Sequence, residues 1–164
     1  MTQNWHQSQR GYFAGSLHSL MGGNSRVWCL SGDLGFGVLD KIRDDYPDRF
    51  LNCGASEQAM LGIAVGLALE EKIPFVYTIT SFFMRAAETI GLYLDGEQIP
   101  VKLVGSGIFN DYKIDGPSHN GTRAQKYLRS LQIVNFYPKT KEEVPGTVLE
   151  MINNGKPSFI GLRR

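Results

Sequence analysis

Short apolar runs rich in β-branched and aromatic residues alternate along this 164-residue chain with longer segments whose apolar residues recur at helical spacing. Strands buried on both faces form continuous apolar runs, and their alternation with helices is typical of a parallel sheet covered by helices. The pattern predicts an α/β fold, a three-layer sandwich with a mostly parallel six-stranded sheet. The expected strands span residues 27–30, 50–53, 75–79, 101–104, 133–137 and 158–162, and the expected helices span residues 7–21, 37–46, 57–72, 82–94, 121–131 and 141–153.

A single domain is expected to occupy residues 1–164. A chain of this length buries roughly 68–70% of its unfolded surface, so it needs neither a disulfide nor a structural metal. Cys29 and Cys53 both lie in apolar runs, which predicts buried free thiols. Ser56 is expected to cap the third helix, and Thr140 with Glu143 predicts a capping box before the last helix.

Composition argues against two classes of partner. The chain carries 17 Lys+Arg against 16 Asp+Glu, with a sequence pI of 7.8, so a nucleic-acid partner is not expected. No uninterrupted apolar stretch reaches the ~20 residues that cross a bilayer, so a membrane partner is not expected. The N-terminal residues 1–6 have neither a basic nor an apolar region of a secretion signal, which predicts a cytoplasmic location.

The predicted helix over residues 57–72 has almost no polar face before Glu70. A helix that is apolar all round must be buried all round. Two interpretations follow: a central helix inside the domain, or a helix that packs against a second chain. We prefer the subunit interface, because helices that flank a six-stranded sheet usually keep one face in water.

Three polar segments follow predicted strands, where open α/β sheets bind ligands. Glu57 lies in the first turn of the apolar helix, Phe82 and Phe83 end the next strand, and His119 lies in a turn with Asp115. Each has an ordinary alternative explanation. The carboxylate complements the helix dipole, the aromatics belong to the core, and the histidine is exposed in a turn.

Other cofactor motifs are missing. A glycine-rich stretch at residues 105–110 follows a strand, but Asn110 replaces the third glycine of the dinucleotide fingerprint and no helix begins there. The sequence also has no Walker loop, no HExxH motif and no Cys/His cluster at metal-ligand spacing. These observations exclude the common nucleotide and zinc sites.

Four segments in register, from about residue 10 to the end of the chain, resemble the pyrimidine-binding domain of transketolase-type thiamine-diphosphate enzymes. They are Ser-Gly-Asp-Leu-Gly at 31–35, Asn-x-Gly-x-x-Glu-Gln at 52–58, Ser-Phe-Phe-x-Arg-Ala at 81–86 and Asp-Gly-Pro-Ser-His at 115–119. The resemblance implies that thiamine diphosphate is the cofactor. Glu57 would hydrogen-bond the ring nitrogen N1′ and favour the imino tautomer of the 4′-amino group, which then deprotonates the thiazolium.

The resemblance also implies roles for other positions. Phe82 would stack on the pyrimidine, and Phe83 and Asp33 would contribute to the cofactor site. His119 would take part in catalysis and hydrogen-bond oxygens of a sugar substrate, and Asp115 would contact a substrate hydroxyl. Arg85 and Arg10 match positions where some relatives bind anionic substrate groups.

One part of the family pattern is absent. The family binds the diphosphate through a divalent metal held by Gly-Asp-Gly and a later Asn, and Gly32-Asp33-Leu34 breaks this motif. We therefore expect the diphosphate-binding domain, with its Mg or Ca ion, on a partner subunit, in a heterotetramer. We likewise expect no C-terminal domain of the family in this chain.

The expected reaction is the transfer of a two-carbon ketol unit between sugars or related carbonyl compounds. A subunit of a 2-oxoacid decarboxylase or carboligase is an alternative, because these reactions share the pyrimidine domain. A non-catalytic partner that stabilises such an enzyme is the third interpretation. His119 and Asp115 suit hydroxylated substrates and favour ketol transfer.

Overall fold

The computed structural model describes residues 5–164, so residues 1–4 of the N-terminal segment used above lie outside the described part. All six predicted strands are present, and they form one sheet in the order β2-β1-β3-β4-β6-β5 with every pairing parallel. The predicted fold class is confirmed. The strands are β1 (Val27–Ser31), β2 (Phe50–Asn52), β3 (Ile73–Ile79), β4 (Lys102–Ser106), β5 (Val134–Phe136) and β6 (Ser158–Leu162).

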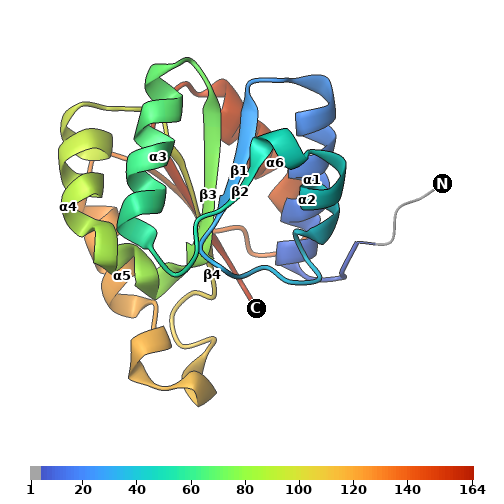
Figure 1. Ribbon diagram of the computed structural model, residues 1–164. Coiled ribbons are helices and arrows are strands. Elements are labelled where there is room, and N and C mark those ends of the chain that lie inside the picture. The colour runs from blue at the N-terminus through green and yellow to red at the C-terminus, as the bar shows by residue number, and fades with distance from the viewer. Residues whose placement is uncertain (1–4) are drawn as a thin grey trace.

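Helices cover both faces of the sheet (Figure 1). On one face lie α1 (Gln9–Gly23), α2 (Asp40–Asp45) and α6 (Val144–Asn153). On the other lie α3 (Glu57–Leu69), α5 (Thr122–Ser130) and the helical segment that contains α4 (Ala87–Thr89). Because each crossover places a helix between parallel strands, all strand carboxyl ends meet at one edge of the sheet.

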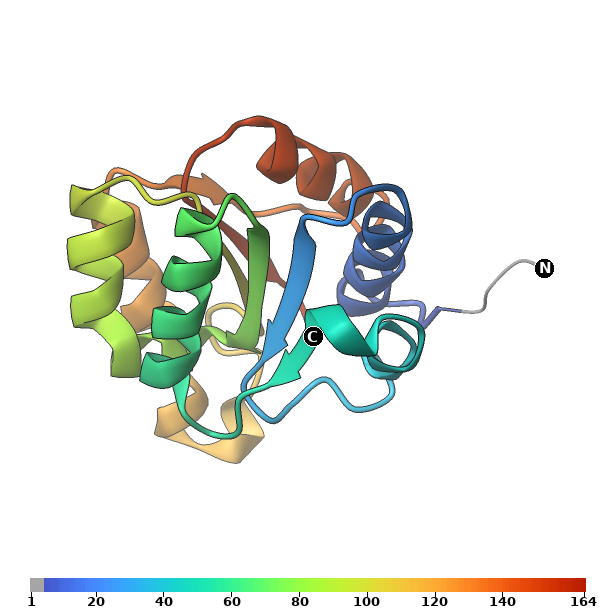
Figure 2. The same cartoon turned by 45° about the horizontal axis from the view of Figure 1, so that its top comes forward.

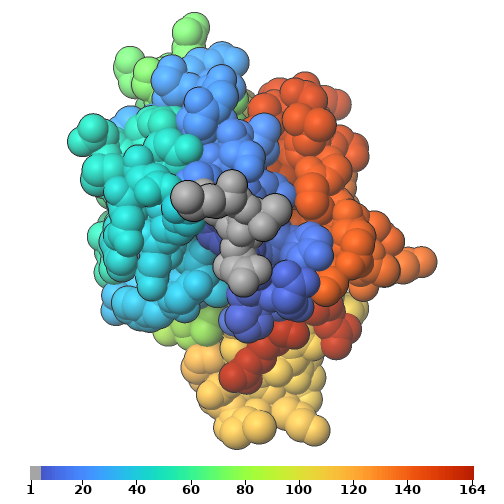
Figure 3. Space-filling view, turned by 90° about the vertical axis from the view of Figure 1, so that its right-hand side faces the viewer, coloured from blue at the N-terminus to red at the C-terminus, as the bar shows by residue number. Residues whose placement is uncertain are grey.

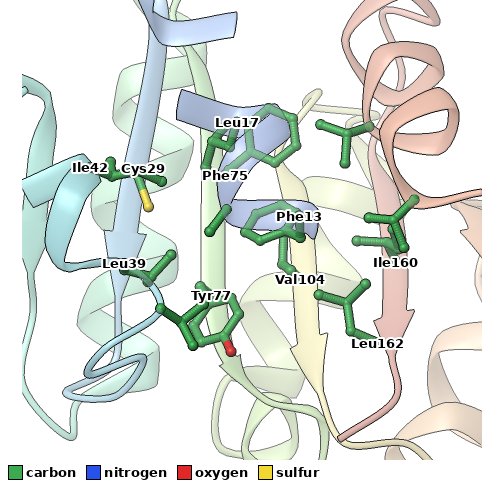
Figure 4. Packing of buried hydrophobic residues seen from close by; sticks show 14 of the residues in the cluster. Phe13, Leu17, Cys29, Leu39, Ile42, Phe75, Tyr77, Val104, Ile160 and Leu162 are labelled. Carbon is green, nitrogen blue, oxygen red and sulfur yellow. The ribbon is translucent and has the colours of Figure 1, made fainter. Parts of the chain in front are cut away.

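The core consists of two apolar layers, one on each face of the sheet. Successive residues of a strand point to opposite faces, so Cys29 enters one layer and Leu30 the other. In the layer beneath α1, Phe13 stacks on Tyr77 with ring centroids 5.9 Å apart (Figure 4). The opposite layer is built around Phe83, which packs edge-on against Phe159.

Both cysteines carry free thiols, as the sequence predicts. Cys29 is fully buried in the layer beneath α1. Cys53 is only half-buried, because it lies just past the end of the short edge strand β2, where one side of the chain is not covered. The expectation of full burial is therefore wrong for Cys53.

The apolar helix α3 is buried along one side only. Met60, Leu61 and Ala64 are fully buried, but Ile63 and Leu69 are 43% and 67% exposed. The interpretation of a central helix buried all round within the domain is therefore wrong. The apolar composition of α3 reflects a wide contact with the sheet plus an outward face that this chain does not cover.

Several predicted helix boundaries are wrong. The expected helix over 82–94 is a composite, which begins as a 3₁₀ helix (η2, Thr80–Ala86), passes through α4 and ends as a π-helix (η3, Ile90–Gly96). The capping box does not form, because α6 begins at Val144 and the Glu143 carboxylate accepts the Lys139 N–H instead. Ser56 does precede α3, but its side chain makes no capping hydrogen bond.

A projection extends beyond the carboxyl edge of the sheet. It follows β4 and comprises two short 3₁₀ helices, η4 (Lys113–Asp115) and η5 (Pro117–His119), seen below the body in Figure 1 and again in Figures 2 and 3. Gly107 begins this excursion with φ +73°, a conformation that L side chains rarely adopt, and Tyr112 packs against it. Within residues 5–164, no helix has the length and apolar character of a membrane span.

At the opposite edge, β4 begins with a buried lysine. Lys102 is 1% exposed, and its Nζ donates to Asn154 Oδ1 at 3.0 Å and to the Lys156 carbonyl at 2.5 Å. Both acceptors lie where α6 ends, where the partial negative charge of a helix C-terminus favours a cation. Burial nevertheless lowers the pKa of Lys102 from 10.5 to about 8.

Candidate active site

The sequence-predicted site residues gather at the carboxyl edge of the sheet. Asp33 follows β1, Glu57 follows β2, Phe82 follows β3 and His119 follows β4. Open parallel sheets bind ligands at this edge, because loops from neighbouring strands converge there. The fold thus brings residues far apart in sequence to one rim.

The buried acid of this rim is paired with an arginine. Glu57 is the first residue of α3 and is 1% exposed, held there because the next turn of the helix carries buried Met60 and Leu61. Both Glu57 carboxylate oxygens accept hydrogen bonds from Arg85 Nη1, at 2.9 Å each. The Arg85 side chain is 53% exposed, so the ion pair joins a buried carboxylate to a guanidinium that reaches the solvent.

Aromatic rings continue the site from this pair. Arg85 Cζ lies 4.2 Å from the centroid of the Phe82 ring, well within the range of a cation–π contact. Phe82 meets the His119 imidazole edge-on, with centroids 5.0 Å apart and planes inclined by 66°. Glu57, Arg85, Phe82 and His119 therefore form one continuous group of side chains, drawn from α3, η2 and η5.

Tyr112 extends the group toward α1. Its ring lies 6.2 Å from His119, and its hydroxyl is hydrogen-bonded to the buried Ser106 hydroxyl at 2.8 Å. Arg10 Nη1 donates to the same Tyr112 hydroxyl at 3.5 Å. Arg164 stacks on the Tyr112 ring, with Cζ 4.8 Å from its centroid.

Three predicted site residues make no contact with the group formed by Glu57, Arg85, Phe82 and His119. Phe83 is fully buried in the core, with its ring against Phe159, so the structure does not bring it to the group around Glu57. Asp33, at φ +56°, exchanges two 3.1 Å hydrogen bonds with Asn52 and ties the ends of β1 and β2 together. Asp115 is exposed on the projection, 3.7 Å from Arg164.

Sequence reasoning missed Tyr112 and Ser106. Ser106 ends a strand and Tyr112 lies in a turn-rich stretch after it, so position at the strand's carboxyl end was the available signal. The pairing of Glu57 with Arg85 was missed too. These two residues are 28 positions apart, and only the fold brings them together.

A cavity of about 660 Å³ lies beside this group rather than over Glu57. Its lining residues come from η2, η5 and α5, and include Ser81, Met84 and Ser118. Within residues 5–164, no three His, Cys, Asp or Glu side chains converge as a metal site would require. The side chains that remain at the site are the Glu57 carboxylate, the Arg85 guanidinium and the Phe82 and His119 rings.

Such a site could hold a flat, nitrogen-rich ring. The acid offers two acceptor oxygens, and the neighbouring Phe82 face already carries a planar group of N–H donors. The Arg85 guanidinium therefore shows that a flat group of N–H donors can contact both the Glu57 carboxylate and the Phe82 ring. This observation supports the fit of an aminopyrimidine. The fold and site define an α/β domain that presents a buried glutamate and an aromatic face at the carboxyl edge of a parallel sheet.

Comparison with known proteins agrees with this class. The profile of the family "Transketolase, pyrimidine binding domain" matches residues 7–164, and the chain belongs to this family. It is 29% identical to 1-deoxy-D-xylulose-5-phosphate synthase of Syntrophus aciditrophicus (strain SB) over 152 residues, 90% of this chain and 23% of that protein. It is 32% identical to transketolase of Homo sapiens over 132 residues, 79% of this chain and 21% of that protein.

Solved structures show the same fold. A structure described as a split gene transketolase, inactive β4 tetramer, superimposes with a TM-score of 0.83 at 26% identity, covering 96% of this chain and 51% of that one. Transketolase of Campylobacter jejuni superimposes with a TM-score of 0.86 at 18% identity, covering 96% of this chain and 26% of that one. This chain spans under a quarter of the length of the two curated relatives above.

Proposed function

We propose that this chain is the pyrimidine-domain subunit of a split, thiamine-diphosphate-dependent, transketolase-like transferase. The observation that carries the proposal is the buried Glu57 carboxylate at the start of α3, which Arg85 links to the Phe82 ring and, through that ring, to the His119 imidazole. A surface carboxylate that only complemented a helix dipole would be exposed to water. Burial of this carboxylate, beside an aromatic face, instead favours a ligand-binding role.

In this proposal Glu57 accepts a hydrogen bond from the pyrimidine N1′, and Phe82 stacks on the ring. The stacking contact contributes about 0.5–1.5 kcal/mol beyond area burial. Thiamine diphosphate, when bound, supplies the carbanion chemistry that joins and cleaves bonds next to a carbonyl. Glu57 controls the proton at N1′, because a carboxylate shielded from water interacts strongly with the one donor that reaches it.

His119 and Asp115 would bind the substrate, a sugar or a related carbonyl compound. Both lie on the projection after β4, and an imidazole and a carboxylate suit the hydroxyl and carbonyl oxygens of a ketose. Arg10, which donates a hydrogen bond to the Tyr112 hydroxyl, would bind an anionic group of the substrate. This arrangement favours ketol transfer over decarboxylation.

A partner subunit would supply the diphosphate-binding domain and the divalent metal, in a heterotetramer. The broken Gly32-Asp33-Leu34 motif supports this division. The outward face of α3, where Ile63 and Leu69 are exposed, would take part in a subunit contact. The similarity to a split gene transketolase supports the same arrangement.

The test is turnover by the reconstituted complex with Glu57→Gln. The amide that replaces the carboxylate keeps its shape and one acceptor but cannot hold a negative charge, so we expect turnover to fall by about 10²–10⁴-fold. Stability should change little by comparison. Asp40→Asn on α2 is the matched control, because Asp40 also lies in a first helical turn, but its side chain is half-exposed and α2 lies on the opposite face of the sheet from α3 (Figure 1).

Two results would contradict the proposal. Near wild-type, cofactor-dependent turnover by the Glu57→Gln complex would remove the role of the carboxylate. Submillimolar binding of thiamine diphosphate by this chain alone, measured by titration calorimetry, would contradict the division between two subunits.

A further inference from the structure

We propose that Arg85 occupies the place of the aminopyrimidine in the free domain, and that its guanidinium must leave both Glu57 and Phe82 before the ring can bind. The inference rests on the proposed function and concerns a step that precedes it. Arg85 then acts as a positioning residue, which keeps the acid paired and the aromatic face covered until the cofactor arrives.

The geometry carries this inference. The guanidinium makes the same two kinds of contact that are proposed for the ring: N–H donation to the Glu57 carboxylate at 2.9 Å, and a position over the Phe82 ring with Cζ 4.2 Å from its centroid. A flat group of nitrogen donors is thus already placed on the acid and on the aromatic face. A pyrimidine cannot reach the Phe82 face while the guanidinium lies on it.

Burial of the two partners is unequal, which makes the exchange physically reasonable. Glu57 is 1% exposed and Arg85 is 53% exposed, so the guanidinium lies between the carboxylate and the solvent. A buried carboxylate that loses its donor is strongly destabilised, so Arg85 leaves readily only when another donor takes its place. The guanidinium can move into water at small cost, because it is already half solvated.

The equilibrium between paired and released Arg85 sets the apparent affinity of the domain for the pyrimidine ring. When the competent state is only a fraction of the molecules, the apparent dissociation constant rises by the inverse of that fraction. If the ion pair is formed in about 90–97% of free molecules, removal of Arg85 tightens ring binding by about 10–30-fold. A residue that only contacts the bound ring would have the opposite effect.

The test uses the 164-residue chain and free thiamine, which carries the aminopyrimidine without the diphosphate. Thiamine binding is measured by an NMR titration for the wild type, Arg85→Met and Arg129→Met. Arg129 is the matched control, because its guanidinium also stacks on an aromatic ring, 4.3 Å from the Tyr137 centroid, at an exposed place on α5. We expect about 10-fold tighter binding for Arg85→Met, as the population argument requires, and no change for Arg129→Met.

A second measurement needs no variant that could fail to fold. The side-chain Nε–H signal of Arg85 in the wild type should move toward the position of a solvated arginine as thiamine saturates the site. Equal or weaker binding by Arg85→Met, or an Arg85 signal that stays unchanged at saturation, would overturn this inference and leave the pyrimidine site intact. Equally tight thiamine binding by the wild type and Glu57→Gln would instead overturn the proposed function itself, because the proposed ring contact is made by the Glu57 carboxylate.

Discussion

Replacement of the buried Lys102 should change how the stability of this domain depends on pH. Lys102 is 1% exposed, its Nζ is bonded to two neutral oxygens, and burial lowers its pKa from 10.5 to about 8. Because the folded pKa lies below the unfolded one, the unfolded chain binds more protons between these values. The free energy of unfolding therefore rises with pH between about 8 and 10.5, and this gain is lost as pH falls through 8.

The size of the effect follows from the pKa change. At 1.36 kcal/mol for each pKa unit, the change from 10.5 to about 8 corresponds to roughly 3 kcal/mol. Other buried groups act in the opposite direction. Burial raises the pKa of Cys29 from 9.0 and that of Tyr77 from 10.0, each to about 12, so the stability that they contribute is lost as pH rises toward 12.

The assay is urea unfolding of the wild type and Lys102→Met across this pH range. Cys29 and Tyr77 are present in both proteins, so the difference between the two free energies of unfolding isolates Lys102. We expect the wild type to gain roughly 3 kcal/mol relative to Lys102→Met from about pH 7 to pH 10.5. Lys126→Met removes an exposed lysine from α5 and should show no such trend.

A flat difference between wild type and Lys102→Met over this range would refute the reasoning. It would mean that the contacts with Asn154 and Lys156 compensate the ammonium for its lost hydration. A difference that falls with pH would mean that the folded state favours the charged lysine, and the helix C-terminus would then dominate over burial.

Two further predictions concern packing and buried hydrogen bonds. Gly105→Ala in β4 should lower the free energy of unfolding by about 1–3 kcal/mol in urea titrations, because the added Cβ would clash with Thr80 and come within 2.8 Å of Phe159. Gly23→Ala is the control, because its added Cβ would enter open space. A free energy of unfolding for Gly105→Ala equal to that of the wild type would contradict this prediction. Gln9→Ala should lower the free energy of unfolding by about 1–3 kcal/mol, because the Gln9 amide donates to the Pro138 carbonyl at 2.9 Å and accepts from the Arg163 N–H at 2.6 Å. An unfolding temperature of Gln9→Ala equal to that of the wild type would contradict this prediction.

The strands could be predicted from sequence because the sheet is covered on both faces. A strand such as β3 is then mostly apolar and buried, whichever way each side chain points, and six such runs give the fold class. Helix boundaries were less predictable. The helical segment after β3 begins at Thr80, two residues earlier than its apolar spacing indicates. Before α6, the Glu143 carboxylate accepts a hydrogen bond from the Lys139 N–H, and this local contact competes with the predicted capping box.

The sequence placed several of the expected residues at one edge of the sheet but did not predict their contacts. Position after a strand and the family resemblance both singled out Glu57, and the fold brings it close to Phe82 and His119 at one rim. Its pairing with Arg85 follows no periodicity, because the two residues belong to different crossovers. Phe83 differs from Phe82 by one position, and that single step turns its side chain into the core.

The five residues of β4 separate two polar groups that do not depend on each other. Ser106 at its end supports Tyr112 next to the proposed catalytic rim, whereas Lys102 at its start is bonded to the end of α6. The four residue steps from Lys102 to Ser106 span about 13 Å along the strand, so the two groups make no direct contact. Substitutions at Lys102 could therefore be used to change the stability of the domain without altering the residues of the proposed catalytic rim.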